Sequence, residues 1–252
     1  MTSSTFSEQH PSSKIGWLNI NGLKNEVIIS TLHRLVIEKQ LDVVFLAEPF
    51  LSPEKEVVLK KIFAEFDVFI RARKKKKTKL YQLKGGIICL VRKNTGKLEK
   101  KQTECDDVLW VHWNHLKLTG AYFVPHNSPF VGKNEKTMTQ LQQRILENER
   151  ERVIVLADAN AWIGELPSVV KTKTEDGTEI RELVLERKTK KKATNKQGEW
   201  FVTSMNNTNM SIVNGLLSPA RHTYIHPGKE ARSIVDFVVV NEREKRRIGH
   251  TI

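Results

Sequence analysis

The chain lacks the residues and segments that mark several common protein classes. Its two cysteines, Cys89 and Cys105, form no CxxC pair and no His/Cys spacing typical of a metal site. This excludes a disulfide framework and indicates a reducing, intracellular compartment. No apolar run approaches the length of a membrane span, and the polar N-terminus has no apolar secretory segment, so we expect no membrane partner. Neither GxGxxG nor GxxxxGK(S/T) occurs, so Rossmann and P-loop nucleotide sites have no support.

Acidic residues are also in deficit. The sequence has 42 Lys and Arg residues against 29 Asp and Glu, a formal net charge of +13. Two acid-free stretches carry the whole excess, with seven bases in Arg71–Lys79 and six in Arg187–Lys196, and the rest of the chain has 29 bases and 29 acids. Clustered bases suit a polyanion such as nucleic acid or an anionic membrane. Lysine runs are equally typical of solvated loops and of nuclear-import signals.

The length and the apolar pattern predict one α/β domain. We expect a disordered tail over residues 1–13 and a single, monomeric domain over 14–252, with basic insertions near 71–79 and 187–196. Helical spacing of apolar residues predicts helices over Lys24–Lys39, Pro53–Phe63, Gly132–Arg152 and Glu199–Asn206. Apolar runs predict strands over Lys14–Ile20, Asp42–Ala47, Phe66–Ala72, Gly86–Arg92, Leu109–Leu118, Thr119–Val124, Val153–Leu156, Met210–Val213, Thr223–Ile225 and Ser233–Val240. The last two are expected to pair through a turn at His226-Pro227-Gly228, and residues 165–198 to be irregular. This mixture favours a mixed sheet over a strictly parallel one.

Polar side chains interrupt or follow the most apolar of these runs. They are Asn19 in WLNING, Glu48 after DVVFLA, Asp158 and Asn160 after VIVLA, and Asp236 in SIVDFVVV. A carboxylate or amide in such a run costs desolvation energy unless it is paired or binds a metal. Strand ends are also where open α/β sheets place their sites. Each residue alone is explained equally well by a turn or a salt bridge, so the argument rests on their convergence.

The order of the segments LNINGL, LAEP, GAYFVP, LADANAWIG, HTY and SIVDFVVV resembles the endonuclease/exonuclease/phosphatase superfamily. Within it, the chain is most similar to the apurinic-endonuclease-like domain of non-LTR (LINE-type) retrotransposons. The resemblance runs from about Lys14 to Val240, and its most specific piece is Asp158-Ala159-Asn160 with a small-residue and glycine continuation. It implies a two-sheet α/β sandwich with four layers, αββα, lacking the last strand.

The resemblance also implies roles for individual residues. Glu48 resembles the carboxylate that binds a catalytic Mg²⁺ (or Mn²⁺), and Asn19 the amide beside that metal. Asp158 resembles the aspartate that aligns or deprotonates the attacking water, and Asn160 and Tyr122 resemble contacts to the scissile phosphate. Asp236 resembles the aspartate that orients a catalytic histidine. Expected DNA contacts are Thr223, Lys74, Lys75, Lys76, Lys190, Lys191 and Lys192.

The chain departs from the family pattern at its end. Active members finish with a Ser-Asp-His segment, which is absent here, and His250 follows Asp236 too soon and lacks the preceding Asp to replace it. Ala47-Glu48-Pro49 also stands where Gln-Glu-Thr is usual, and Ala157 where glycine is frequent. The resemblance therefore implies a Mg²⁺-dependent DNA endonuclease domain of retrotransposon origin, C-terminally truncated and weak or inactive. A non-catalytic DNA-binding remnant and a phosphatase of the same superfamily are the alternatives.

Overall fold

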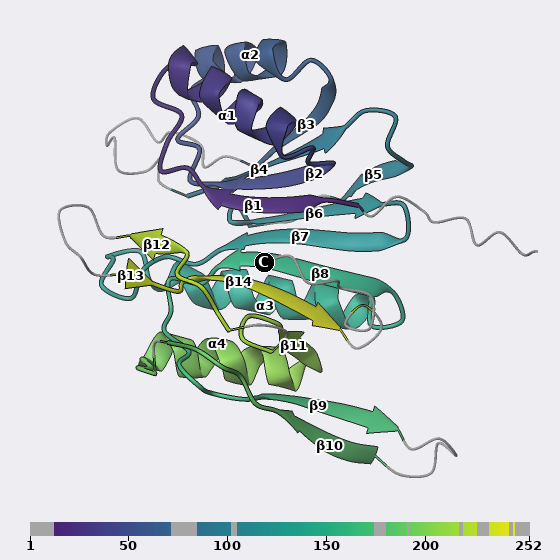
Figure 1. The fold of residues 1–252 in the computed structure, drawn as a ribbon, viewed down its shortest axis with the longest axis vertical. Coiled ribbons are helices and arrows are strands. Elements are labelled where there is room, and N and C mark those ends of the chain that lie inside the picture. Colours follow the sequence, from purple (N-terminus) through teal and green to yellow (C-terminus); the bar gives the residue numbers. More distant parts are fainter. Residues whose placement is uncertain are drawn as a thin grey trace, which may run out of the picture.

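A computed structural model of the chain describes residues 13–71, 85–101, 105–173, 180–190, 192–216, 219–225, 232–241 and 244. Two β-sheets pack face to face, and two helices cover the outer face of each sheet (Figure 1). The four-layer αββα sandwich expected from the sequence is confirmed. Within the described ranges, no helix combines the length and apolarity needed to cross a bilayer.

The first sheet has the strand order β1-β2-β4-β3, with β1 parallel to β2 and the other neighbours antiparallel. Its strands are β1 (Ile15–Asn19), β2 (Val43–Ala47), β3 (Phe66–Arg71) and β4 (Ile87–Arg92). Helices α1 (Glu26–Glu38) and α2 (Pro53–Ile62) cover it. Asn25 caps α1 and Ser52 caps α2, each accepting a hydrogen bond from a backbone N–H of the first turn.

The second sheet has the order β11-β14-β8-β7-β6-β5. Its strands are β5 (Leu98–Lys101), β6 (Val108–Trp113), β7 (Leu116–Tyr122), β8 (Arg152–Asp158), β11 (Met210–Ile212) and β14 (Asp236–Asn241). Helices α3 (Lys133–Glu147) and α4 (Lys196–Asn207) cover its outer face (Figure 1). Strands β7 and β8 are parallel, whereas β14 runs antiparallel to β8.

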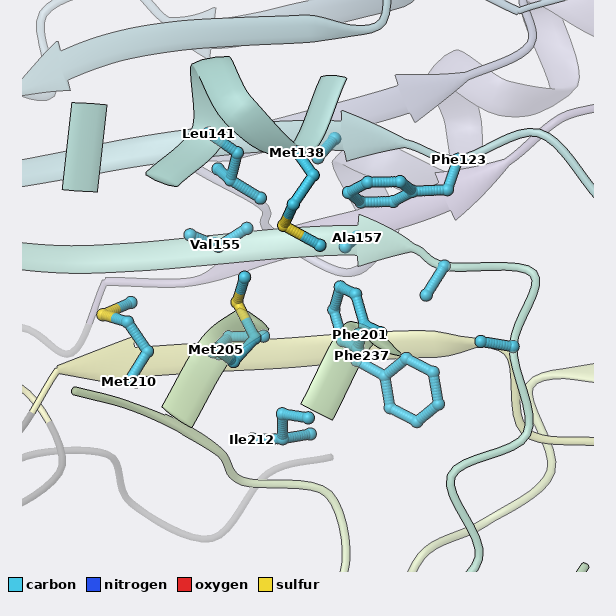
Figure 2. Close-up of a cluster of buried hydrophobic side chains, with 14 of the residues drawn as sticks. Phe123, Met138, Leu141, Val155, Ala157, Phe201, Met205, Met210, Ile212 and Phe237 are labelled. Atoms are coloured by element: carbon cyan, nitrogen blue, oxygen red, sulfur yellow. The ribbon is translucent and has the colours of Figure 1, made fainter. Parts of the chain in front are cut away.

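Apolar side chains fill the spaces between all four layers. Figure 2 shows the cluster under α3 and α4, where Met138 and Leu141 of α3 and Met205 of α4 pack around Val155 and Ala157 of β8. A second cluster lies between the two sheets, and a third lies between the first sheet and its helices. Because β8 is apolar on both faces, it can only sit in the middle of such a sandwich.

The predicted strand boundaries around residue 114 are wrong. Leu109–Leu118 is not one strand, because β6 ends at Trp113 and β7 begins at Leu116. Asn114 makes the turn with a φ of 54°, and its side-chain oxygen accepts a hydrogen bond from the backbone N–H of Lys97. Asparagine tolerates this left-handed conformation better than most residues, so a hairpin forms inside an otherwise apolar run without glycine or proline. Strand β5 was also missed.

The predicted strand Ser233–Val240 is also wrong, because it divides into two elements. Strand β13 (Arg232–Ser233) pairs with β12 (Tyr224–Ile225), while β14 starts at Asp236 and pairs with β8. Asp236 therefore lies at the beginning of a strand and not within one. The expected turn at residues 226–228 lies outside the described residues.

Residues 165–198 are more regular than predicted. They include the antiparallel pair β9 (Ser168–Lys173) and β10 (Ile180–Leu185), which projects beyond α4 in Figure 1. Helix α4 begins at Lys196 and not at Glu199. Gly198 lies within the first turn of this helix. A Cβ at this position would come 2.0 Å from the carbonyl oxygen of Trp162. The helix can therefore approach the loop after β8 only with glycine at this position.

Arg187 does not belong to the exposed part of the second basic stretch. It is 5% exposed. Its guanidinium donates hydrogen bonds to the carbonyl oxygens of Leu166, Ile212 and Asn214 and to the hydroxyl of Ser168. Burial lowers the pKa of Arg187 to about 10, so the group stays charged at neutral pH. The sequence analysis counted Arg187 among the bases available to a polyanion. That assignment is wrong, because the guanidinium is buried and its N–H groups already donate to protein acceptors.

We expect Arg187→Met to lower the free energy of unfolding by about 2 kcal/mol or more, because it leaves buried acceptors without donors. Lys188→Met is the matched control, since its side chain is exposed, and it should change stability by less than about 0.5 kcal/mol. Urea denaturation of both variants measures the difference. Equal losses in the two variants would contradict the role of Arg187.

Candidate active site

One cleft of about 910 Å³ collects residues from distant parts of the chain. It is lined by all seven of the residues that the sequence singled out outside the lysine runs, namely Asn19, Glu48, Tyr122, Asp158, Asn160, Thr223 and Asp236. Strand direction explains the convergence. Asp158 at the end of β8 is in register with Tyr122 at the end of the parallel β7 and with Asp236 at the start of the antiparallel β14. Asn19 ends β1, in register with Ala47, directly before Glu48.

Two of these residues have a strained backbone. Glu48 has a φ of 54° and Asn160 a φ of 45°. Positive φ is tolerated by asparagine but is rare for glutamate, particularly before a proline. Glu48 is held there from both sides, because its N–H donates to the carbonyl of Gly86 and its carbonyl accepts from the N–H of Gly22. Such strain is concentrated at functional sites, and here it turns Glu48 out of the strand direction and into the cleft.

Asn19 joins two carboxylates. Its side-chain Nδ2 donates to Oε1 of Glu48 at 3.1 Å and to Oδ2 of Asp158 at 2.8 Å. Its Oδ1 accepts the backbone N–H of Asn21 at 2.9 Å, which fixes the orientation of the amide. The amide nitrogen therefore bridges side chains from the two different sheets.

The other oxygen of Asp158 is also fixed. Oδ1 accepts the backbone N–H of Asn160 at 3.0 Å, and Nδ2 of Asn160 donates to the carbonyl of Phe123 at 2.9 Å. Asp158 is 2% exposed. Its carboxylate therefore has a single orientation at the floor of the cleft.

Asp236 has a partner that sequence reasoning missed. The indole Nε1–H of Trp17 donates to Oδ1 of Asp236 at 2.8 Å, and a side-chain hydrogen bond with Thr223 also favours the charged carboxylate. The hydroxyl oxygen of Thr223 accepts the backbone N–H groups of Val235 and Asp236. In the sequence, Trp17 looked like one more apolar residue of a buried strand. Its position two residues before Asn19, on the same side of β1, was the available signal.

Two buried amides, also missed, hold the ends of β7 and β8. Asn134 exchanges two hydrogen bonds with the backbone of Val124. Gln197 donates to the carbonyls of Val124 and Ala159. These side chains, from α3 and α4, fix the backbone next to Tyr122 and Asp158. His126, in the exposed loop that follows, lines the cleft as well.

The cleft concentrates negative charge. Burial, followed by the charge of Asp236, raises the pKa of Asp158 well above its ordinary value, against the hydrogen bonds from Asn19 and Asn160. Burial raises the pKa of Asp236 as well, opposed by Trp17 and Thr223. No lysine or arginine of the described ranges lines the cleft to offset the three carboxylates.

This charge arrangement fits a hard divalent cation. Among the described residues, no group of three or more His, Cys, Asp and Glu side chains is arranged to hold a metal ion. Mg²⁺ needs less, since it is commonly held by one or two carboxylates with waters completing its shell. Glu48 and Asp158 supply such oxygens. Asn19 presents its nitrogen to them, so it acts here as a donor, and its assignment as a direct metal ligand stays a prediction.

Of the six lysines predicted to contact DNA, two lie among the described residues. Lys74, Lys75, Lys76 and Lys191 lie outside the described residues, whereas Lys190 and Lys192 are exposed and Lys192 lies 3.5 Å from a carboxylate oxygen of Glu165. Their segment is tied into the domain by the bridges Ile163–Thr194 and Thr189–Ala220. It therefore runs between the loop that carries Trp162 and the segment that leads to Thr223, both of which line the cleft.

Solved structures with the same fold cover almost the whole chain. The endonuclease domain of TRAS1, a telomere-specific non-LTR retrotransposon, matches with a TM-score of 0.63 at 15% identity, over 95% of this chain and 90% of that one. The 3′ phosphatase NExo from Neisseria, bound to a product DNA hairpin, matches at 0.66 and 12% identity, with the same coverage. An AP endonuclease from Archaeoglobus fulgidus matches at 0.64 and 10% identity, again over 95% and 90%. No protein-family model and no curated protein matches the sequence. The endonuclease/exonuclease/phosphatase fold that the sequence motifs implied is confirmed by these structures.

The raised pKa of Asp158 makes the stability of the folded protein depend on pH. Because its pKa is raised, folded Asp158 holds a proton to higher pH than the unfolded chain does. The resulting stabilisation is present at low pH and is lost as the pH rises through the folded pKa. We therefore expect the stability of the wild type in chelator to fall as the pH rises, and Asp158→Asn to remove part of this fall, because asparagine carries no charge.

Urea denaturation between pH 4 and pH 8 measures this effect, with exposed Asp106→Asn as the control. An Asp158→Asn variant whose stability falls with pH as steeply as that of the wild type would contradict the expectation.

Proposed function

We propose that this chain is a nuclease-type domain that hydrolyses phosphodiester bonds in DNA with Mg²⁺ or Mn²⁺ as cofactor, acting as a monomer. The observation that carries the proposal is the bridge between the two sheets, in which one amide of Asn19 holds Glu48 and Asp158 side by side. Placing two carboxylates side by side out of water costs desolvation free energy. Such an arrangement is typical of a site that binds a cation together with an anionic substrate.

The origin of the domain in a non-LTR retrotransposon belongs to the same proposal. The structure of the TRAS1 endonuclease domain shares the fold over nearly its whole length, and the segment order in this chain is most similar to that class. The NExo structure was solved with a DNA hairpin, which supports DNA as the substrate of this chain.

The cation, when bound, would neutralise charge that accumulates on the phosphate in the transition state. Glu48 and Asp158 would hold it. The proposed task of Asp158 is to orient the attacking water and accept its proton, and the hydrogen bonds from Asn19 and Asn160 aim its carboxylate for that task. Asn160 and Tyr122 flank Asp158 in the cleft, where they would contact the phosphate.

A supercoiled-plasmid nicking assay tests the catalytic proposal. We expect slow nicking by the wild type that needs Mg²⁺ or Mn²⁺ and stops in chelator. Asp158→Ala should reduce the rate by about 10²-fold or more, the usual contribution of a general base. Lys171→Met, exposed on β9 and outside the cleft, serves as the control. Equal nicking by Asp158→Ala and wild type would remove the catalytic role.

One observation favours a second candidate, a domain that binds DNA without cutting it. Asp236, the residue expected to orient a histidine, has its Oδ1 occupied by the indole of Trp17. An indole N–H can donate a hydrogen bond but cannot shuttle a proton at neutral pH, so Trp17 itself supplies no general acid-base help beside Asp236.

Salt dependence of DNA retention separates the contributions of the basic segment. We expect the affinity to fall steeply with salt, and the double variant Lys190→Ala with Lys192→Ala to make the log–log slope shallower by about one for each of these lysines that binds a phosphate. Lys171→Ala, an exposed lysine on β9, is the control. DNA retention that survives Glu48→Gln in a protein that never nicks would favour the second candidate. A slope unchanged by the double variant would exclude this segment from DNA binding.

A further inference from the structure

The two most exposed Phe, Trp and Tyr side chains of the described residues line the same cleft. Within the described residues, Trp162 is 37% exposed and Tyr224 is 42% exposed, and every other aromatic side chain is less exposed. Both line the cleft that holds Asp158. They come from different segments, the loop after β8 and strand β12. Water-exposed aromatic surface is costly, and its restriction to a single cleft indicates a ligand with an apolar face.

The backbone of Trp162 is held rigidly although its indole is exposed. Its N–H donates to Oδ1 of Asn195, and its carbonyl accepts the N–H of Asn195. The same asparagine caps α4 by accepting the N–H of Gly198. Gly198 in turn lets the helix touch the Trp162 carbonyl. The position from which the indole enters the cleft is therefore fixed before a ligand binds.

The remaining lining of the cleft indicates what kind of ligand this is. The cleft has no lysine or arginine among the described residues, but it is rich in neutral amides, including Asn21, Asn127 and Asn195 beside the two in the catalytic network. Aromatic faces and amides suit flat, uncharged groups with hydrogen-bonding edges. They do not suit a bare phosphate chain, which binds arginine and lysine. Nucleobases have this combination of a flat face and a polar edge.

We propose that Trp162 is a stacking platform for an unstacked nucleobase next to the bond that is cut, with Tyr224 as a second aromatic wall. The inference rests on the proposed function and deepens it. In an intact duplex, both faces of each base are covered by neighbouring bases, so an indole can reach a face only where a nucleotide is unpaired or turned out. Trp162 follows Asn160 by two residues, so a base on the indole belongs to a nucleotide close to the phosphate at Asn160. The preferred substrate is therefore DNA with an unpaired nucleotide at the cleavage position.

Fluorescence anisotropy with labelled DNA in chelator tests this without hydrolysis. The three probes are a fully paired hairpin, the same hairpin with one internal unpaired thymidine, and the same hairpin with a single-stranded 3′ overhang. The wild type should prefer the two probes that offer an unstacked base, and the two arms identify whether the base is internal or terminal. Trp162→Ala should weaken binding to the preferred probe roughly tenfold, the scale of one base–aromatic stack, with little effect on the paired hairpin.

Conservative and matched variants separate stacking from damage to the fold. Trp162→Phe keeps an aromatic face and should restore most of the preference, whereas Leu146→Ala, an exposed apolar residue of α3 outside the cleft, should change nothing. Equal weakening of all three probes by Trp162→Ala, or no rescue by phenylalanine, would overturn the proposal.

The outcomes also distinguish this inference from the proposed function. A wild type that prefers unpaired DNA but never nicks a plasmid would support the stacking role of Trp162 and contradict the proposed nuclease activity. A wild type that nicks in a Mg²⁺-dependent manner without preferring unpaired DNA would do the reverse. A wild type that binds none of the probes would remove both.

Discussion

The structure depends on how three carboxylates are kept together in a buried cleft. Burial raises the pKa of Asp158, and the like charge of Asp236 adds to the effect, so the ionised carboxylates are costly to hold together. Donors that the fold provides offset it. Asn19 donates to two of the carboxylates, the N–H of Asn160 to Asp158, and the indole of Trp17 to Asp236. The donors come from both sheets, so the site exists only when the sheets are packed together.

Buried polar side chains connect the irregular segments to the sandwich. Asn134 and Gln197 hold the ends of β7 and β8 from the helices that cover them, and Arg187 joins its own segment to the backbone carbonyls of Leu166, Ile212 and Asn214. Each of these groups has its hydrogen bonds satisfied, which is the condition for burying it at little net cost. Their effect is to fix loops that would otherwise move. A cleft bounded by loops can then hold its residues as precisely as a strand does.

The pairing of Trp17 with Asp236 is a feature that the motif order did not predict. The indole N–H fixes the carboxylate of Asp236, and the ring adds an apolar surface to the cleft. It adds to exposed Trp162 and Tyr224, so the aromatic lining of the cleft comes from distant parts of the chain.

The residue pattern by itself predicted an α/β domain with a mixed sheet and most of the cleft residues, and the resemblance of the segment order implied the four layers. Apolar runs such as that of β8 and polar residues at their ends predicted Asn19, Glu48, Asp158 and Asp236, since these patterns depend only on strand period and burial. Only the tertiary structure decided which donor faces which carboxylate, that Asp236 begins its strand, and that Arg187 is buried while Lys190 is exposed. The turn at Asn114 was missed because a left-handed asparagine leaves no distinct mark in an apolar run. Composition and periodicity are local, whereas hydrogen bonds such as that between residues 17 and 236 join parts of the chain that meet only after the sheets have packed.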